Sequence, residues 1–203
     1  MRIHQIVPTS LVCLLLAATA CRGTIDRRID PDEPDPVGGA NLRSQDIVTM
    51  ADEMARDIKA FGVLRNAPPG EQVTFFTAGL VNESSDPINS TIITTKLRTN
   101  LFKAFGGQVT ILDRSPEALE AVKRERDAKR NGAVTSNESK QGNVFGADYV
   151  LKGRIQDRVL QSGKRKSAYY LVTFELTDLE TSRLVWTGDY ETKFDSEKSV
   201  IAR

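Results

Sequence analysis

Histidine and cysteine are almost absent from this sequence, which has one histidine and two cysteines among 203 residues. All three, His4, Cys13 and Cys21, lie in the first 21 positions. Serine–histidine and cysteine–histidine catalysis need an imidazole, and the usual zinc sites need histidine or thiolate ligands. If the chain is cleaved before Cys21, the mature protein has neither an imidazole nor a disulfide partner. We therefore expect no catalytic site, no metal site and no cofactor.

An excess of either charge and a long hydrophobic run are also lacking. The chain has 28 basic and 27 acidic residues, so no global field attracts nucleic acid, and we expect no nucleic-acid partner. The apolar stretch at residues 11–18 is too short for a membrane-spanning helix.

The first 20 residues have the features of a cleaved export signal that ends at a lipidated cysteine. Arg2 precedes the apolar stretch, and the small residues Thr19 and Ala20 precede Cys21. We expect Cys21 to carry the lipid that anchors the mature protein to a membrane. The alternative is an ordinary secretory signal, and Ala18 favours it because such lipoprotein motifs usually have an aliphatic residue there. Arg22 stands where inner-membrane retention signals have Asp, so resemblance to other such signals implies outer-membrane anchoring, facing the periplasm.

The next segment is rich in charge and proline. Residues 21–43 include three prolines and hardly any adjacent apolar residues, which predicts a disordered tether. Residues 22–43 span at most about 75 Å when fully extended. Residues 44–203 have the length of one globular domain.

Three stretches of this domain have the pattern of helices. Apolar residues recur at helical spacing from Ile47 to Phe61, after a capping Ser44 and before a terminating Gly62. The same spacing runs through residues 88–105, and Ser115 begins a third helix over 116–130. This last helix has opposite charges four residues apart, which indicates a solvated surface more than a basic partner surface.

Five segments have the pattern of strands, separated by polar turns. The expected strands are residues 71–81, 109–112, 149–160, 169–176 and 184–194, and residues 82–87, 163–166 and 180–182 form turns. Helices interleaved with strands, followed by a meander, predict an α+β fold. We expect a single mixed, largely antiparallel sheet packed by three to four α-helices. Residues 131–143 are polar and predict a loop.

Candidate binding residues gather near the turn at residues 163–166. Lys164, Arg165, Lys166 and nearby Tyr169 could contact an anionic partner, such as lipid phosphates or an acidic protein surface. The stretch is not a phosphate-binding loop, because Arg158 stands where the first glycine would be. Trp186, Tyr170 and Tyr190 could form an aromatic contact patch, but on strands such residues are more often core. Among the acids, Asp148 and Glu175 lie at the start of a predicted strand and within one, where solvent-facing roles are commoner than catalysis.

Three segments resemble the LpoB family of outer-membrane lipoproteins. They are GLVNESSDPINSTIITTKLRTNLF at 79–102, FGADYVLKGRI at 145–155 and YYLVTFELTDLETSRLVW at 169–186. The resemblance covers about residues 41–194 and implies a noncatalytic activator. Its domain would pass through openings in peptidoglycan, touching it in passing, and bind a bifunctional penicillin-binding protein. Such binding would stimulate glycan polymerisation and peptide crosslinking during cell-wall synthesis.

Two other classes of function remain open at this stage. One is an envelope assembly or secretion lipoprotein related to those of curli secretion or flagellar assembly, whose folds are similar more loosely. The other is a hydrolase that works with carboxylates alone, which a test of the purified protein on peptidoglycan would reveal.

Overall fold

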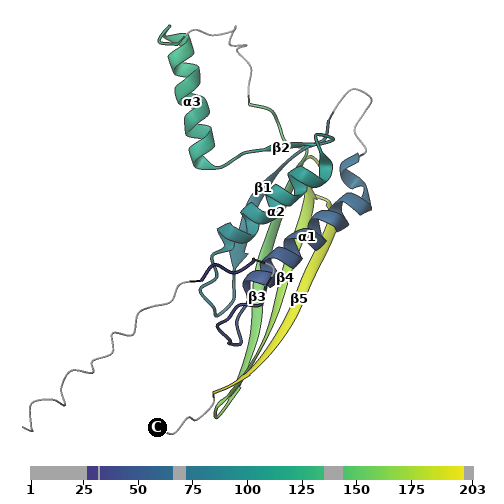
Figure 1. Cartoon of the computed structure of the whole chain (residues 1–203). Helices are drawn as coiled ribbons and strands as arrows, with labels where there is room; N and C mark the ends of the chain where they lie inside the picture. Colours follow the sequence, from purple (N-terminus) through teal and green to yellow (C-terminus); the bar gives the residue numbers. More distant parts are fainter. Residues whose placement is uncertain (1–26, 32, 66–71, 135–143, 199–203) are drawn as a thin grey trace, which may run out of the picture. The chain divides into compact units, whose positions relative to one another are not determined.

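The computed structural model describes residues 27–31, 33–65, 72–134 and 144–198. The signal at residues 1–20, Cys21, part of the predicted tether and residues 135–143 of the predicted loop lie outside these ranges. The chain divides into two compact units, 1–30 and 31–203, and the second contains every helix and strand among the described residues. Figure 1 shows this unit as one curved sheet with helices on it.

The sheet has five strands in the order β2-β1-β3-β4-β5. β1 is parallel to both of its neighbours, β2 and β3, whereas β3, β4 and β5 form an antiparallel meander. This confirms the predicted α+β class with one mixed, largely antiparallel sheet. The strands are β1 Thr74–Asn82, β2 Thr110–Leu112, β3 Tyr149–Ser162, β4 Arg165–Asp178 and β5 Leu184–Glu197.

Two helices lie side by side on one face of the sheet: α1 (Ser44–Phe61) and α2 (Ser90–Phe105) (Figure 1). α1 contacts α2 and β5, and α2 contacts β1. Gly62 ends α1 as predicted, and Gly106 ends α2; both take the left-handed conformation, with φ of 79° and 54°. A short 3₁₀ helix, η1 (Val63–Arg65), follows α1.

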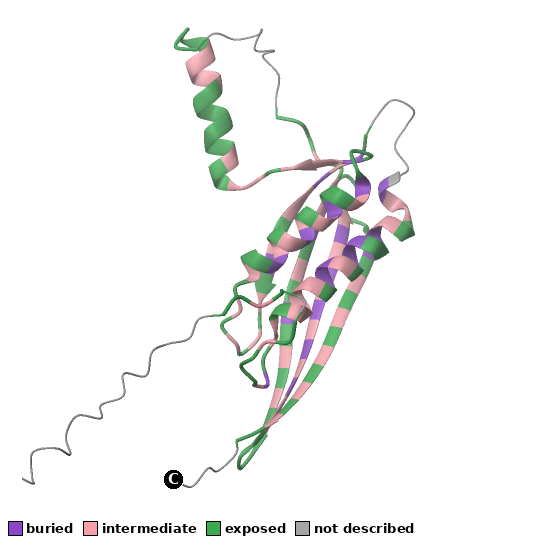
Figure 2. Ribbon diagram, viewed as in Figure 1, coloured by how far each residue is buried: buried purple, intermediate pink, exposed green. Residues whose placement is uncertain are grey.

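The third helix, α3 (Pro116–Arg130), has no buried residue (Figure 2). Ser115 caps it as predicted, with its hydroxyl accepting from the N–H of Ala118 at 3.3 Å. Of the predicted charge pairs, Glu125 and Lys129 lie 3.4 Å apart. α3 is thus the solvated helix that its sequence indicates.

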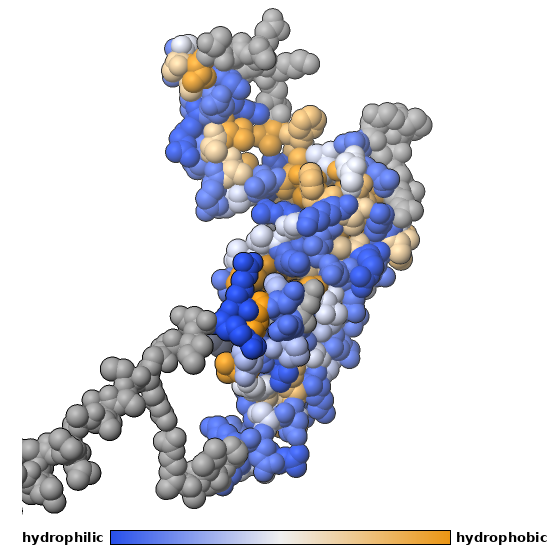
Figure 3. Space-filling view, in the orientation of Figure 1, coloured by the Kyte–Doolittle hydropathy of each residue, from blue (hydrophilic) through white to orange (hydrophobic). Residues whose placement is uncertain are grey.

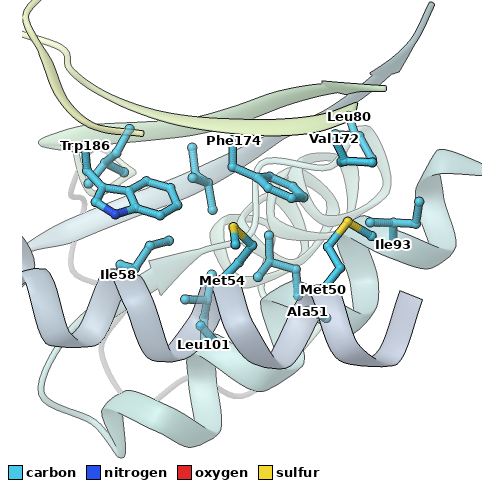
Figure 4. Close-up of a cluster of buried hydrophobic side chains, with 14 of the residues drawn as sticks. Met50, Ala51, Met54, Ile58, Leu80, Ile93, Leu101, Val172, Phe174 and Trp186 are labelled. Atoms are coloured by element: carbon cyan, nitrogen blue, oxygen red, sulfur yellow. The ribbon is translucent and has the colours of Figure 1, made fainter. Parts of the chain in front are cut away.

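The core lies between the two packed helices and the sheet (Figure 4). Met54 and Ile58 of α1 point toward Phe174 and Trp186 of the sheet, and Met50 lies beside Ile93 of α2 (Figure 4). Burial of each large apolar side chain stabilises the fold by about 1.5–3 kcal/mol. The apolar residues that recur at helical spacing in α1 and α2 therefore pack against the apolar residues that alternate along the strands.

The first two helices begin differently from the sequence prediction. The N-cap of α1 is Arg43, not Ser44, and the Asp46 carboxylate accepts from the Arg43 N–H at 2.8 Å. Ser44 bonds instead to the Asp35 carboxylate, so it is not available as a cap. α2 begins two residues later than predicted, because the Asn89 side chain accepts the N–H of Thr91 at 3.1 Å and caps it there.

Residues 33–43 contact the folded domain. The Asp35 carboxylate accepts the Ser44 N–H at 2.9 Å, and Ala40 is only 2 % exposed. The Arg43 guanidinium carbon lies 4.9 Å from the centroid of the Phe194 ring on β5. This part of the predicted tether is therefore held against α1 and the sheet.

Candidate functional site: the uncovered face of the sheet

Alternation along β4 separates the two faces of the sheet. Alternate residues from Ala168 to Leu176 are buried under α1 and α2. The residues between them, from Tyr169 to Thr177, are half-buried and point to the opposite face. Neither α1 nor α2 covers this second face, which we call the uncovered face.

Charges on the uncovered face are sorted by strand. β3 places the basic residues Lys152, Arg154 and Arg158 there, opposite outward-facing residues of β4. β5 places the acidic residues Asp189 and Glu191 there, again opposite outward-facing residues of β4. The face therefore has a basic column on β3 and, on β5, a mainly acidic column that is interrupted by Lys193.

The basic column is only partly neutralised. Lys152 Nζ lies 3.4 Å from a Glu175 carboxylate oxygen, and Arg154 Nη1 lies 3.8 Å from one of Glu83. Such partly exposed pairs contribute less than about 1 kcal/mol to stability, so their members can exchange partners. Arg158 forms no ion pair with any described residue. The column can thus offer positive charge to an acidic surface.

Tyr169 occupies the middle of this face. Its cross-strand neighbours are Arg158 on β3 and Lys193 on β5. Partial removal from water, and then a hydrogen bond with the Glu191 carboxylate, raise the pKa of the Tyr169 hydroxyl. The Tyr169 hydroxyl thus keeps its proton, and it is already engaged with the Glu191 carboxylate.

The structure separates the four residues predicted to bind a partner. The turn between β3 and β4 is only Gly163 and Lys164, because the strands pair as far as Ser162 and Arg165; the predicted turn at 163–166 was too long. Lys166 therefore lies in β4.

Within β4, alternation sends these side chains in different directions. Arg165 Nη2 bonds to the Asp195 carboxylate at 2.8 Å, and Arg165 shares the uncovered face with Tyr169. Lys166 points the other way, and its Nζ donates to Asn41 Oδ1 at 3.2 Å. Lys164 stays at the turn. The structure therefore brings Arg165 and Tyr169 onto one face and places Lys166 on the other.

The remaining aromatic candidates belong to the core. Trp186 is 3 % exposed, and its Nε1 donates to Asp57 on α1 at 2.8 Å. Tyr170 is fully buried and its hydroxyl donates to Asp86. The Tyr190 hydroxyl donates to Asp46 at 2.9 Å. Each of these three side chains joins the sheet to a helix or a loop, which confirms the core interpretation.

The acidic candidates also have structural roles. The Asp148 carboxylate accepts the Thr74 N–H at 2.7 Å and so links the starts of β1 and β3. Glu175 pairs with Lys152 on the uncovered face. Within the described ranges, no group of three or more histidine, cysteine or acidic residues could hold a metal ion. Nor does any helix in those ranges combine the length and apolar composition needed to cross a bilayer.

Comparison with known families identifies the family of this chain. The sequence profile of the LpoB family, described as "Peptidoglycan-synthase activator LpoB", matches residues 46–192. The chain belongs to the LpoB family. The match extends from the first turn of α1 to Thr192 on β5, so it includes α2, the strands β1 to β4 and most of α1 and β5.

Solved structures of LpoB domains are among the similar folds. The LpoB C-terminal domain from Salmonella enterica is 17 % identical, with a TM-score of 0.39, over 68 % of this chain and 94 % of that one. The Escherichia coli domain is 14 % identical, with a TM-score of 0.39, over 72 % and 98 %. Lipoprotein GNA1162 from Neisseria meningitidis is 16 % identical, with a TM-score of 0.38, over 64 % and 88 %. No curated protein sequence matches the chain.

Sequence reasoning missed the basic column, although a signal was present. Lys152, Arg154 and Arg158 are separated by even numbers of residues within the predicted strand 149–160. A period of two places such residues on one face of a strand. The charge on this LpoB-family sheet could therefore have been found from the sequence.

Proposed function

We propose that this protein is an outer-membrane-anchored, noncatalytic lipoprotein that binds and activates a bifunctional penicillin-binding protein. The acylated Cys21 holds it to the membrane, and the domain faces the periplasm. Residues 1–20 are the cleaved signal, residues 21–43 form the tether and residues 44–203 form the domain. Activation works by binding the synthase preferentially in its active conformation.

The single observation that carries this proposal is the family match over residues 46–192, because the family consists of peptidoglycan-synthase activators. The uncovered face supports it physically. A half-buried strand surface with separated basic and acidic columns is suited to a protein partner with the complementary pattern. Lys164, Arg165 and Tyr169 lie at or near this face and remain candidates for the contact.

The contacts of residues 33–43 affect how far the domain reaches from the membrane. Eleven residues separate Cys21 from Glu33, and they extend at most about 40 Å. Release of residues 33–43 from α1 and β5 would extend the reach to the full tether length of about 75 Å. The synthase must therefore meet the domain close to the outer membrane, or its binding must accompany this release.

A binding experiment tests the proposal. The full-length protein in detergent is titrated against the purified bifunctional penicillin-binding protein of the same organism, with a monofunctional transpeptidase as control. We expect saturable binding to the bifunctional enzyme and none to the control. Absence of binding to the bifunctional enzyme, or equal binding to both, would contradict the proposal.

A further inference from the structure

The sheet has one edge that is only partly paired. β2 pairs with β1 at Thr74, Phe75 and Phe76, and no described strand pairs with the rest of β1 on that side. From Thr77 to Asn82, alternate backbone N–H and C=O groups therefore point away from β3 without a strand to receive them. Such an edge is a template for another strand.

A hollow of about 620 Å³ runs along this free edge. Its walls are residues 76–81 of β1 and the side of α2 that carries Thr91, Thr95 and Arg98. Residues 113–116, between β2 and α3, also line it. Thr91 and Thr95 are exposed, so an added strand would lie beside β1 with hydroxyl groups of α2 flanking it.

The opposite edge of the sheet is protected, whereas this one is not. β5 has 14 residues, and five of them are charged: Asp189, Glu191, Lys193, Asp195 and Glu197. Charged side chains along an edge strand oppose pairing with another chain. β1 has no charged residue among its nine. This asymmetry favours addition of a foreign strand at β1 over head-to-tail pairing of two copies through β1 and β5.

The charge around the free edge indicates the chemistry of the added strand. α2 has three basic residues, Lys96, Arg98 and Lys103, and no acidic one. On the other side, Gly79 and Val81 are in register with Lys152 and Arg154 of the basic column. Asp113 also lines the hollow, with a carboxylate oxygen 3.7 Å from Arg98 Nη1, but together with Arg114 the lining keeps a net positive charge, which suits an acidic segment.

The region near the edge also has apolar surface. Phe102 of α2 is 66 % exposed, and it lines a hollow of about 270 Å³ together with Ile111 and Leu112 of β2. Hydrophobic atoms gather around β2 in the space-filling view (Figure 3). An added segment that continued past Phe76 would therefore meet an apolar contact beyond the hydrogen-bonding edge.

A bulge limits the length over which regular pairing is available. The pairing of β1 with β3 shifts between Thr77 and Gly79, and Gly79 has a φ of 97°. Regular extended backbone thus runs from Leu80 to Asn82, which corresponds to about 10 Å of strand. An added strand of about three residues fits this length.

We propose that the free edge of β1 binds an extended acidic segment of the peptidoglycan synthase by strand addition. This inference rests on the proposed function and assigns one part of the contact to the free edge of β1. Backbone hydrogen bonds to β1 provide affinity, and the flanking basic side chains select acidic residues.

The test compares two tryptophan substitutions at exposed threonines on different helices. Thr95→Trp fills the hollow beside β1, whereas Thr49→Trp places the same side chain on α1, away from that edge. Binding of each full-length variant to the cognate bifunctional penicillin-binding protein is measured in detergent. We expect Thr95→Trp to raise Kd about tenfold or more and Thr49→Trp to leave it within about twofold. Equal Kd values for two variants with wild-type melting temperatures would overturn the inference.

A charge substitution provides a second variant. Arg98→Gln removes a basic group, which pairs with Asp113, from the hollow and leaves a shorter polar side chain. We expect a weaker complex whose Kd depends less on salt than that of the wild type. An unchanged salt dependence would contradict the acidic character of the segment.

The outcomes separate this inference from the function on which it rests. A wild-type protein that does not bind the synthase overturns both. A wild-type protein that binds, with Thr95→Trp binding equally well, overturns the strand addition alone. Sedimentation of the isolated protein that shows dimers lost in Thr95→Trp would assign the edge to a second copy and overturn the synthase as its occupant.

Discussion

Gly153 of β3 passes the carbonyl oxygen of Thr173 on β4 so closely that a Cβ at position 153 would lie 2.6 Å from that oxygen. The same Cβ would lie 2.7 Å from Leu80 and 2.9 Å from Phe174. These two buried side chains thus occupy the space that a side chain at 153 would take. Glycine at this position lets the core close over the junction of β1, β3 and β4.

We predict that Gly153→Ala lowers the free energy of unfolding by about 1–3 kcal/mol, because the backbone oxygen cannot move aside as a flexible side chain could. Urea denaturation measures the change. Gly146→Ala is the matched control, since a Cβ there would meet nothing within 4 Å. Equal stability of Gly153→Ala and the control would contradict the close packing.

The contact between Arg43 and Phe194 predicts that residues 33–43 contribute to stability. Arg43→Ala should lower the free energy of unfolding by about 1 kcal/mol through loss of the cation–π contact. Arg28→Ala, at an exposed position, should have no effect. Urea denaturation of both variants checks this. Equal urea midpoints for Arg43→Ala and Arg28→Ala would mean that residues 33–43 do not hold Arg43 on the Phe194 ring.

Tyr170 predicts a loss of stability in alkali. Burial, and then the Asp86 carboxylate, raise the pKa of Tyr170 in the folded state above its unfolded value of about 10. The folded protein therefore keeps this proton more tightly than the unfolded chain does. The contribution of the protonated Tyr170 hydroxyl to the free energy of unfolding is fully present below about pH 10 and is lost as the pH rises above that value.

Urea denaturation between pH 8 and pH 11 tests this prediction. The wild type should lose stability above about pH 10, whereas Tyr170→Phe should show a shallower decline, because Phe has no proton to lose. Tyr190, whose pKa is also raised by burial and by Asp46, should account for part of the remaining slope. Identical slopes in the two proteins would contradict the role of Tyr170.

The proposed anchor predicts one chemical modification. Mass spectrometry of the native protein should find its N-terminus at Cys21 and bearing lipid. Cys21→Ser should abolish the lipid and release the protein from the outer-membrane fraction. Intact signal residues, or an unmodified Cys21 in the wild type, would contradict the anchor.

The sequence was a good guide where one periodicity ran long enough to reveal the buried face. The apolar residues of α1 and α2 define their buried sides, and alternation identifies β4. Helix ends were predicted well where a glycine stops the helix, as at Gly62. They were predicted less well where a distant side chain competes for the cap, as Asp35 does for Ser44.

The candidate site depended on pairing that no local pattern specifies. Lys166 and Tyr169 are three residues apart in one strand and so face opposite sides, but this followed only once the turn was known to be two residues long. The place of β1 between β2 and β3 arises from parallel pairing across long connections. The free edge of β1 is a consequence of that order, and no local sequence pattern reveals it.

The rate of glycan polymerisation by the cognate bifunctional penicillin-binding protein tests the central claim most directly. The enzyme is supplied with its lipid-linked precursor, with and without the full-length protein, and chain formation is followed in time. The account predicts a faster rate that saturates with the concentration of the added protein, and no product when the protein is added without the enzyme. An unchanged rate at saturating concentration would contradict the assignment of this chain as an activator.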